Sequence, residues 1–173
     1  MQNSNWAIRP CRDDEHEIIL AIVNAAAEAY RGAIPADRWH EPYMSAEELR
    51  REIASGVAFS ACEMAGEMVG VMGIQPVRNV ELVRHAYVRP DRQGHGIGKE
   101  LMKKLREGTS RQVLVGTWAA ATWAIGFYER NGFRLVPEDV KPLLLRTYWA
   151  IPERQIETSV VLADSRWLER RRT

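Results

Sequence analysis

The stretch that decides the fold is Val88-Arg-Pro-Asp-Arg-Gln-Gly-His-Gly-Ile-Gly98. An apolar run typical of a β-strand precedes it, and apolar residues at helical spacing follow it. Its alternate glycines let the backbone bend tightly and bring N–H groups close to a ligand. The start of the following helix adds unpaired amides and the positive end of its dipole. This strand–loop–helix unit therefore predicts a site for phosphate.

Two familiar phosphate motifs do not fit this loop. A Walker A loop has four residues between its glycine and its Gly-Lys pair, and Ser or Thr follows. Here Gly94 and Gly98 are separated by three residues, and Glu100 follows Lys99. A dinucleotide fingerprint reads G-x-G-x-x-G, whereas this loop reads G-x-G-x-G and lies mid-chain. Mg-nucleotide and NAD chemistry are therefore disfavoured.

The loop, preceded by Tyr87-Val88-Arg89-Pro90, resembles the acetyl-CoA pyrophosphate loop of the GNAT acetyltransferases, Q/R-x-x-G-x-G/A. About thirty residues further on, Trp123-Ala-Ile-Gly-Phe-Tyr-Glu-Arg-Asn-Gly-Phe133 is similar to the F-Y-x-x-x-G-F segment of that family. Two motifs in this order and spacing rarely arise by chance. The resemblance covers roughly residues 5–163, and its specific part is Tyr87–Phe133.

The resemblance implies an α/β GNAT fold, with a mixed central β-sheet of about seven strands and helices on both faces. It also implies acetyl-CoA as co-substrate, with loop amides on the pyrophosphate and the preceding strand pairing with the pantetheine. Ala121 stands where relatives often have an asparagine that contacts the pantetheine. The residues that the resemblance assigns to acetyl-CoA are Ala86, Tyr87, Val88, Gln93, Gly94, His95, Gly96, Ile97 and Gly98.

The implied reaction is direct attack of a primary amine on the thioester in a ternary complex. The amine must lose a proton, the oxyanion needs a donor, and the thiolate needs a proton. Tyr128 suits the last task, because a phenol of pKa about 10 stays protonated at neutral pH. By two-residue alternation, Glu81, Val83, His85 and Tyr87 share one strand face, so Glu81 and His85 are the candidate bases. The oxyanion donor is expected to be a backbone N–H near Val88.

In the resembling family, the loop between the first two helices and the last hairpin shape the acceptor pocket. Here these segments are aromatic, with Tyr30 and Trp39 in the first and Tyr148 in the second. Aromatic rings with polar edges suit a small, partly apolar amine or a peptide terminus. A peripheral hydrophobic cluster explains the same residues equally well.

The local patterns predict a single domain over residues 1–173, with a core at about 5–163. Ser45 and Glu48 form a capping-box pattern, and Ala65-Gly66 separates two strand candidates in a predicted hairpin. The apolar face of the first helix is expected at Ile18, Ile22, Ala25, Ala26 and Ala29. The remaining predicted elements are strands at 6–9, 80–88, 113–117, 133–136 and 155–162 and helices at 97–107 and 119–130, with a longer excursion at 143–148.

Composition narrows the class further. With 24 Lys and Arg against 23 Asp and Glu, the net charge of +1 gives no field that predicts nucleic-acid or membrane binding. Cys11 and Cys62 indicate neither a disulfide framework nor a metal site, and the polar N-terminus resembles no signal peptide. We therefore expect a cytoplasmic protein without a metal, and a homodimer is plausible by family habit.

Two rival functions remain. One is a non-catalytic acyl-CoA-binding regulatory module that keeps the loop but has lost the chemistry. Tyr128 argues against it. The other is a nucleotide-binding protein that uses the glycine loop for ATP or NAD, and the motif mismatches argue against that.

Overall fold

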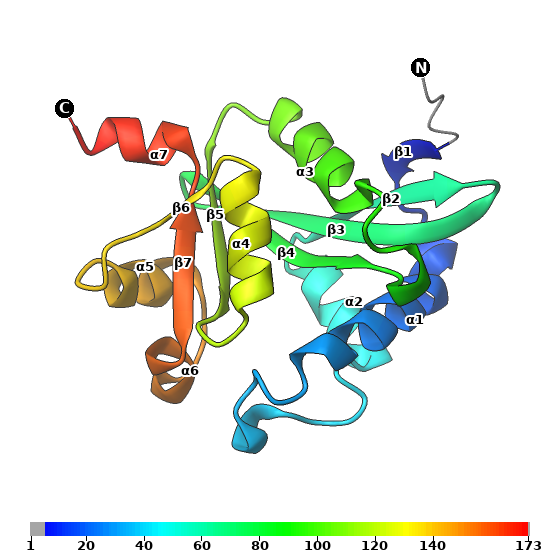
Figure 1. The fold of residues 1–173 in the computed structure, drawn as a ribbon, viewed down its shortest axis with the longest axis horizontal. Helices are drawn as coiled ribbons and strands as arrows, with labels where there is room; N and C mark the ends of the chain where they lie inside the picture. The colour runs from blue at the N-terminus through cyan, green and yellow to red at the C-terminus, as the bar shows by residue number, and fades with distance from the viewer. Residues whose placement is uncertain (1–5, 173) are drawn as a thin grey trace. The chain divides into compact units, whose positions relative to one another are not determined.

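The computed structural model describes residues 6–172, which form one mixed β-sheet and seven α-helices (Figure 1). The sheet has seven strands in the order β1-β2-β3-β4-β5-β7-β6, which confirms the expected fold class. The strands are β1 Trp6–Pro10, β2 Ala58–Met64, β3 Glu67–Val77, β4 Val80–Val88, β5 Gln112–Trp118, β6 Arg134–Leu135 and β7 Ser159–Ala163. The helices are α1 His16–Ala27, α2 Ala46–Ala54, α3 Ile97–Glu107, α4 Thr122–Arg130, α5 Lys141–Tyr148, α6 Glu153–Glu157 and α7 Ser165–Arg170.

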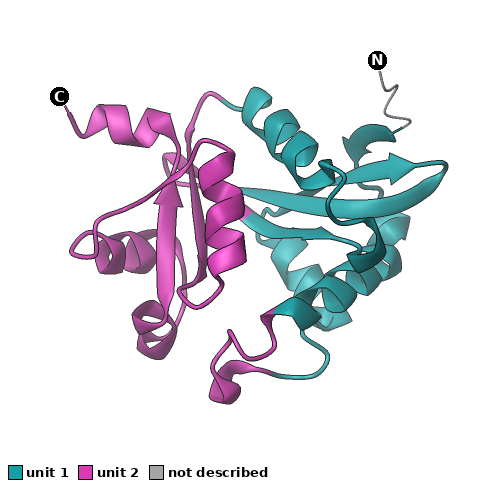
Figure 2. Ribbon diagram, in the orientation of Figure 1, with its two compact units in different colours: residues 1–29, 40–75, 84–109 teal, residues 30–39, 76–83, 110–173 magenta. Residues whose placement is uncertain are grey.

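The chain is organised as two compact units, drawn in different colours in Figure 2. Unit 1 comprises residues 1–29, 40–75 and 84–109, and unit 2 comprises residues 30–39, 76–83 and 110–173. Strand β4 contributes to both, with 84–88 in unit 1 and 80–83 in unit 2.

Unit 1 is built on antiparallel strands with helices on both of its faces. β1 pairs with β2, and β2 pairs with β3 through the predicted hairpin at Ala65-Gly66. Val71 lies in a core cluster with residues of α1 and α2, whereas a Cβ at neighbouring Gly70 would meet Ile97 and Leu101 of α3. Because successive residues of a strand face opposite sides, α3 covers one face and α1 with α2 covers the other.

The start of α2 follows the predicted capping box. The Oγ atom of Ser45 accepts a hydrogen bond from the Glu48 amide at 3.1 Å, and a Glu48 carboxylate oxygen accepts from the Ser45 amide at 2.7 Å. Both bonds satisfy amides that have no intrahelical partner, so the helix begins where the local sequence predicts.

The apolar face of α1 is rotated from the predicted one. Ile18 is 46% exposed, and Ala25 and Ala29 are also exposed, so this part of the prediction is wrong. Helix α1 has apolar residues on more than one face, so the sequence allows two overlapping apolar stripes. The stripe that packs against the core includes the neighbouring pairs Ile22–Val23 and Ala26–Ala27. The buried residues are Ile19, Ile22, Val23, Ala26 and Ala27.

Unit 2 contains the parallel pair that the sequence predicts. Residues 80–83 of β4 pair in parallel with residues 112–115 of β5, and β7 pairs antiparallel with both β5 and β6. Leu114 and Val161 lie in a core cluster with residues of α5, α6 and α7. Helix α4 runs in roughly the same direction as β5 and β7 in the view of Figure 1.

The last third of the chain departs most from prediction. The predicted strand at 155–162 begins inside helix α6, which covers Glu153–Glu157, and β7 covers only Ser159–Ala163, all of it buried. The excursion at 143–148 is helical, the strand at 133–136 shrinks to two residues, and α4 begins at Thr122 rather than 119. The basic tail forms α7, which Asp164 caps by accepting a hydrogen bond from the Trp167 amide.

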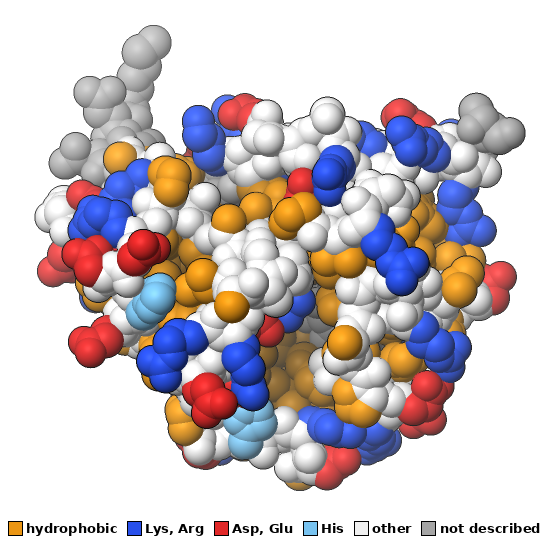
Figure 3. Space-filling model, turned by 180° about the vertical axis from the view of Figure 1, so that it is seen from behind, with side chains coloured by type: hydrophobic (Ala, Val, Ile, Leu, Met, Phe, Trp, Pro, Cys, Tyr) orange, Lys and Arg blue, Asp and Glu red, His pale blue; other side chains and the backbone are white. Residues whose placement is uncertain are grey.

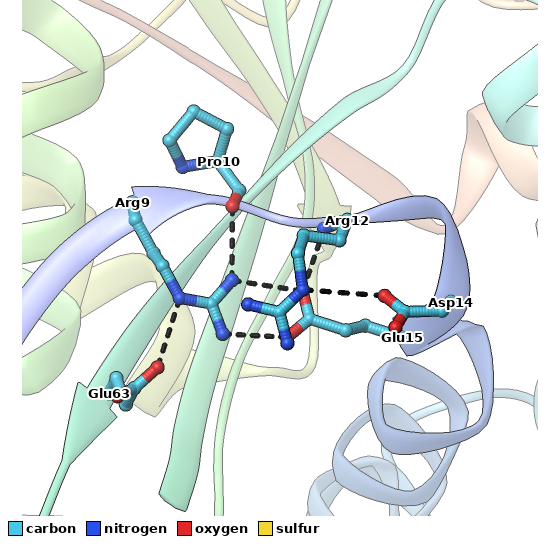
Figure 4. Close-up of polar contacts among 6 residues, drawn as sticks. All are labelled: Arg9, Pro10, Arg12, Asp14, Glu15 and Glu63. Atoms are coloured by element: carbon cyan, nitrogen blue, oxygen red, sulfur yellow. Dashed lines mark hydrogen bonds and ion pairs between the residues drawn. The ribbon is translucent and has the colours of Figure 1, made fainter. Parts of the chain in front are cut away.

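A buried carboxylate fixes the start of the chain in unit 1 (Figure 4). Arg9 of β1 donates to both oxygens of Glu15, at 2.6 and 2.9 Å, and its Nε donates to Glu63 of β2 at 2.9 Å. The Arg12 amide also donates to Glu15 at 2.7 Å. These hydrogen bonds, with that from Arg9 foremost, lower the pKa of Glu15 to about 2.

The surface is mixed in charge. Lys and Arg side chains alternate with Asp and Glu side chains over the face shown in Figure 3, as the net charge of +1 implies. Within residues 6–172, each helix is too short or too polar to cross a bilayer.

Candidate active site

The glycine loop takes backbone angles that a side chain would disfavour. After β4, Pro90–Arg92 forms a 3-10 turn, and Gly94 and Gly96 then have φ of 80° and 83°. Only glycine adopts this left-handed region without the clash between Cβ and the carbonyl oxygen. Gly96 is the N-cap of α3, so the loop runs directly into the helix start as predicted.

The amides at the start of α3 are free of intrahelical bonds. The Glu100 amide donates to the Gly96 carbonyl at 3.1 Å. The three preceding amides, of residues 97–99, have no acceptor within the helix. A Cβ at Gly94 would meet no atom within 4 Å, and one at Gly96 would meet only the Trp6 ring at 3.9 Å. An open loop surface with unpaired donors and a helix dipole fits the diphosphate of CoA.

The polar side chains of the loop fold back on its own backbone. Gln93 donates from Nε2 to the Val88 carbonyl at 3.2 Å, and Nδ1 of His95 lies 3.2 Å from the Arg92 carbonyl. Arg89 is held by Asp91 and Glu67. The backbone amides and the partly exposed guanidinium of Arg92 are therefore the donors that this loop offers to a ligand.

Strand β4 changes its side-chain alternation at His85. This residue has φ of 51°, which is left-handed and rare outside glycine. Arg84 and His85 are consecutive, yet both reach Glu52 of α2. The predicted row of Glu81, Val83, His85 and Tyr87 on one face is therefore wrong, because the irregular residue resets the alternation.

Glu52 is the centre of a polar cluster in unit 1. Its carboxylate accepts hydrogen bonds from Arg84 Nη2 at 2.8 and 2.9 Å and lies 3.2 Å from His85 Nε2. Burial raises the pKa of Glu52, but the hydrogen bond from His85 and the charge of Arg84 outweigh it and leave the pKa below its ordinary value. The carboxylate is therefore ionised at neutral pH.

Ala86, Tyr87 and Val88 lead from this cluster to the glycine loop. The Tyr87 hydroxyl donates to the Tyr43 hydroxyl at 3.2 Å, and the Arg89 amide donates to the Val69 carbonyl of β3. Strand β4 pairs with β5 only at residues 80–83, so the pairing ends before Ala86, Tyr87 and Val88.

Tyr128 is buried in α4 of unit 2, between the rings of Phe127 and Phe133 at 5.2 and 5.9 Å. Its hydroxyl makes no hydrogen bond with any residue in the described part of the chain. Burial raises the pKa of Tyr128 strongly, and the nearby Tyr30 adds to the rise. The phenol is therefore a neutral donor in an apolar environment.

The remaining predicted residues also lie in unit 2. Glu81 is ion-paired with Arg111 at 3.9 Å. Tyr30 packs edge-on against Trp123 at 5.3 Å, and Trp39 lies under the guanidinium of Arg31 at 4.7 Å. Tyr148 donates a hydrogen bond to Asn79 at 2.9 Å.

Two features of these surroundings were not predicted from the sequence. Trp123 is inside the second motif and was recognisable as an aromatic neighbour, but Glu52 carries no local signal because charged residues are common on an amphipathic helix. Among residues 6–172, three or more His, Cys, Asp or Glu side chains nowhere converge as they would around a metal ion.

The fold and loop can be compared with known proteins. A family model described as acetyltransferase (GNAT) domain matches residues 20–141, which is well over half of the chain. The chain belongs to the GNAT acetyltransferase family and is an acyltransferase. The resemblance of its two motifs is thereby confirmed.

Solved structures share the fold at low sequence identity. A PaiA N-acetyltransferase of Thermoplasma acidophilum in complex with coenzyme A has a TM-score of 0.68 at 16% identity, covering 92% of this chain and 98% of that one. A GNAT acetyltransferase of Elizabethkingia anophelis with acetyl-CoA bound has a TM-score of 0.62 at 18% identity, covering 94% and 99%. The Escherichia coli ribosomal-protein-S18-alanine N-acetyltransferase has 0.61 at 15%, covering 92% of each chain. No curated protein matches the sequence.

Proposed function

We propose that this acyltransferase moves an acetyl group from acetyl-CoA to a primary amine of a small molecule or peptide, by direct attack in a ternary complex. The observation that carries the proposal is the loop that contains Gly94 and Gly96. Their left-handed backbone angles lead the chain from β4 to the start of α3, where the first amides have no intrahelical partner. The CoA and acetyl-CoA complexes among the structural neighbours support the same donor.

In this proposal, the loop residues Gln93–Gly98 hold the pyrophosphate through their amides. The helix dipole adds roughly half a positive charge at the same point. The backbone of residues 86–88 pairs with the pantetheine, and an amide near Val88 donates to the oxyanion. The chain offers these groups within unit 1, on one strand and the turn that follows it.

Tyr128 serves as the acid for the departing thiol. Its hydroxyl supports this role, because it has no hydrogen-bond partner among the described residues and so can donate to a bound ligand. The raised pKa keeps the proton in place until a thiolate forms. That thiolate is also strongly basic where water is excluded.

The acceptor is bound by the aromatic residues Tyr30, Trp39 and Tyr148 of unit 2. Tyr30 supports this assignment best, since it lies near enough to Tyr128 to raise the pKa of that phenol and its ring packs against Trp123. Among the neighbours are an N-acetylglutamate synthase and a ribosomal-protein-alanine N-acetyltransferase. An α-amino group on an amino acid or a peptide is therefore the acceptor to test first.

Two measurements test the proposal. Calorimetric titration with CoA, acetyl-CoA, ATP and NAD should give binding for the CoA compounds alone, and release of CoA thiol should then be followed across a panel of amines. Folded protein that binds no CoA compound would refute the acyl-donor assignment. Tight binding without thiol release for any amine would favour the rival of a non-catalytic acyl-CoA-binding module.

A further inference from the structure

The polar cluster around Glu52 lies outside the glycine loop and has no role in the phosphate site. It joins three elements of unit 1, with Glu52 from α2, Gln75 from β3, and Arg84 and His85 from β4. Each of these side chains is at most partly exposed, and that of His85 is 15% exposed. Partly buried charges are costly unless they are paired and hydrogen-bonded, and the side chains of this network satisfy one another.

The backbone of β4 brings two members of this network together. In a regular strand, Arg84 and His85 would point to opposite faces of the sheet. The φ of 51° at His85 brings both onto the α2 side, where they share one carboxylate. A histidine in this conformation is strained, and such strain is found where geometry matters for function.

The network holds the carboxylate of Glu52 in one orientation. Nη2 of Arg84 spans both oxygens, and Nη1 donates to Gln75 Oε1 at 2.9 Å. Gln75 in turn donates to the carbonyl oxygen of Ser55, just after α2, at 3.0 Å. A side chain fixed from two strands and its own helix can orient whatever group it contacts.

The contact to His85 defines which nitrogen carries the proton. An ionised carboxylate only accepts hydrogen bonds, so the Nε2 atom 3.2 Å from Glu52 must be the N–H donor. In neutral His85, Nδ1 is then left with its lone pair. No residue in the described part of the chain hydrogen-bonds to Nδ1, and the ring is otherwise supported by stacking on Phe59 at 6.1 Å.

We infer that Glu52 is the positioning residue that fixes the tautomer of His85, and that Nδ1 of His85 takes the proton from the acceptor amine. This rests on the proposed function and decides between the two candidate bases. Glu81 is already ion-paired with Arg111, whereas His85 directly precedes the strand residues proposed to bind the pantetheine.

The acceptor nitrogen loses two protons in this reaction, and each has a named recipient. An ammonium acceptor gives one proton to Nδ1 of His85, which passes it to water. The free amine then forms the C–N bond at the thioester carbon. When the C–S bond breaks, sulfur takes the proton of Tyr128, and the second proton of the former ammonium nitrogen restores the phenol.

The charged and titratable groups near Glu52 set the conditions for this role. Glu52 is negative and Arg84 is positive, so the carboxylate is shared between a cation and the imidazole. Tyr43 has a pKa raised by burial, and its phenol is therefore neutral. Glu48, one turn before Glu52 on α2, adds a negative charge on the same side.

The first experiment compares pH profiles of kcat/KM for the wild type, His85→Gln, Glu52→Gln and a control, Glu47→Gln. Glu47 is exposed on the same helix and pairs with Arg51 at 3.7 Å, so the control should be unchanged. His85→Gln should lower kcat/KM at neutral pH about 100-fold, with recovery as rising pH deprotonates the amine itself. Glu52→Gln should cost about tenfold, because a neutral amide allows either tautomer.

Unchanged affinity for acetyl-CoA in both variants would separate this role from folding or donor binding. An active His85→Gln variant with the wild-type profile would overturn the inference, as would a Glu52→Gln variant that retains full activity. Neither result would refute acetyl transfer. Conversely, a wild type that binds no CoA compound would refute the proposed function and, with it, the role of His85 as base.

The second experiment needs no acceptor. Nitrogen NMR of the imidazole rings, with His85 assigned by substitution among the four histidines, should show the Nε2–H tautomer in the wild type. Glu52→Gln should shift the population toward a mixture. An Nδ1–H tautomer in the wild type would contradict the positioning role whether or not an acceptor has been found.

Discussion

At the scale of single residues, Gly96 links the backbone to the proposed chemistry. Its φ of 83° places it in the left-handed region, where a Cβ costs about 1–2 kcal/mol. The position itself has room, since the nearest atom to a Cβ would be a ring carbon of Trp6 at 3.9 Å. A substitution there thus changes the backbone and not the packing.

Gly96→Ala should therefore weaken binding of CoA by about tenfold, because relief of the strain moves the amides that face the phosphates. Isothermal calorimetry measures the change. Gly66→Ala is the matched control, because Gly66 has φ of 81° with nothing within 4 Å of a Cβ but lies in the β2–β3 turn. The control should lose similar stability and keep its affinity, and equal affinity in both variants would contradict the loop assignment.

Tyr128→Phe should lower kcat about tenfold or more while the affinity for acetyl-CoA persists, since only the donated proton is removed. Stopped assays of thiol release give kcat, and calorimetry gives the affinity. Phe127→Leu on the same helix perturbs the same ring cluster without removing a hydroxyl, and its kcat should stay within about threefold of wild type. Full activity of Tyr128→Phe would exclude Tyr128 as the acid.

Residue identities were predictable where they belong to a motif and not where they depend on distant partners. Tyr128 and the loop glycines stand in short contiguous patterns. Glu52 is 32 positions from Arg84, and nothing near it in the sequence indicates that β4 will be irregular at His85. We therefore assumed that the side chains of β4 alternate strictly between the two faces of the sheet, and this assumption is wrong at His85.

At the scale of elements, local capping signals were the most reliable guide. The start of α2 and the β2–β3 hairpin both follow from a few neighbouring residues. The phase of α1 and the helical state of residues 153–157 depend instead on what covers them. Their apolar residues suit more than one arrangement, and only packing against the sheet selects one.

Ser45→Ala should lower the free energy of unfolding by about 1 kcal/mol, because it leaves the Glu48 amide without its acceptor. Urea denaturation monitored by circular dichroism measures this. Glu48→Gln retains an acceptor for the Ser45 amide and should cost less than half as much. Equal stability of Ser45→Ala and wild type would show that water replaces the cap at no cost.

From the hydrogen bonds of Glu15 we predict that part of the protein's stability is lost in acid. Its pKa is lowered to about 2, so the stability it contributes is fully present above the unfolded pKa of about 4.3 and is lost as pH falls through 2. Unfolding experiments between pH 5 and 2 should therefore show a decline that is flattened in Glu15→Gln. Glu17→Gln, an exposed neighbour in α1, should follow the wild type. A wild type whose stability stays constant over that range would contradict the lowered pKa.

At the scale of the whole molecule, the two units are interleaved along the chain. The boundaries fall after residues 29, 39, 75, 83 and 109, and β4 belongs to both units. We expect one cooperative domain over the chain, because unfolding either unit removes part of a strand from the other.

Two optical probes test that expectation. Five of the six tryptophans, Trp39, Trp118, Trp123, Trp149 and Trp167, lie in unit 2, so fluorescence reports mainly on that unit. Far-ultraviolet circular dichroism reports on helices of both. The two urea transitions should have the same midpoint, and separated midpoints would indicate two independently folding units.

The strand order was beyond the reach of local reasoning. The parallel pairing of β4 with β5 was predicted from a strand, a helix and a second strand. The placement of β7 between β5 and β6 was not, since Ala163 pairs with Leu114 on one side and Arg134 on the other. That arrangement depends on residues far apart in sequence, which no short pattern encodes.

The interleaving also limits how this gene can be divided. A fragment that ends at residue 109 contains all of unit 1 together with two segments of unit 2, residues 30–39 and 76–83. The complementary fragment, which begins at residue 110, lacks these two segments. No single break separates the unit that contains the glycine loop from the unit that contains Tyr128. Evolution by recombination of these units, or their exchange between relatives in the laboratory, would require several simultaneous crossovers.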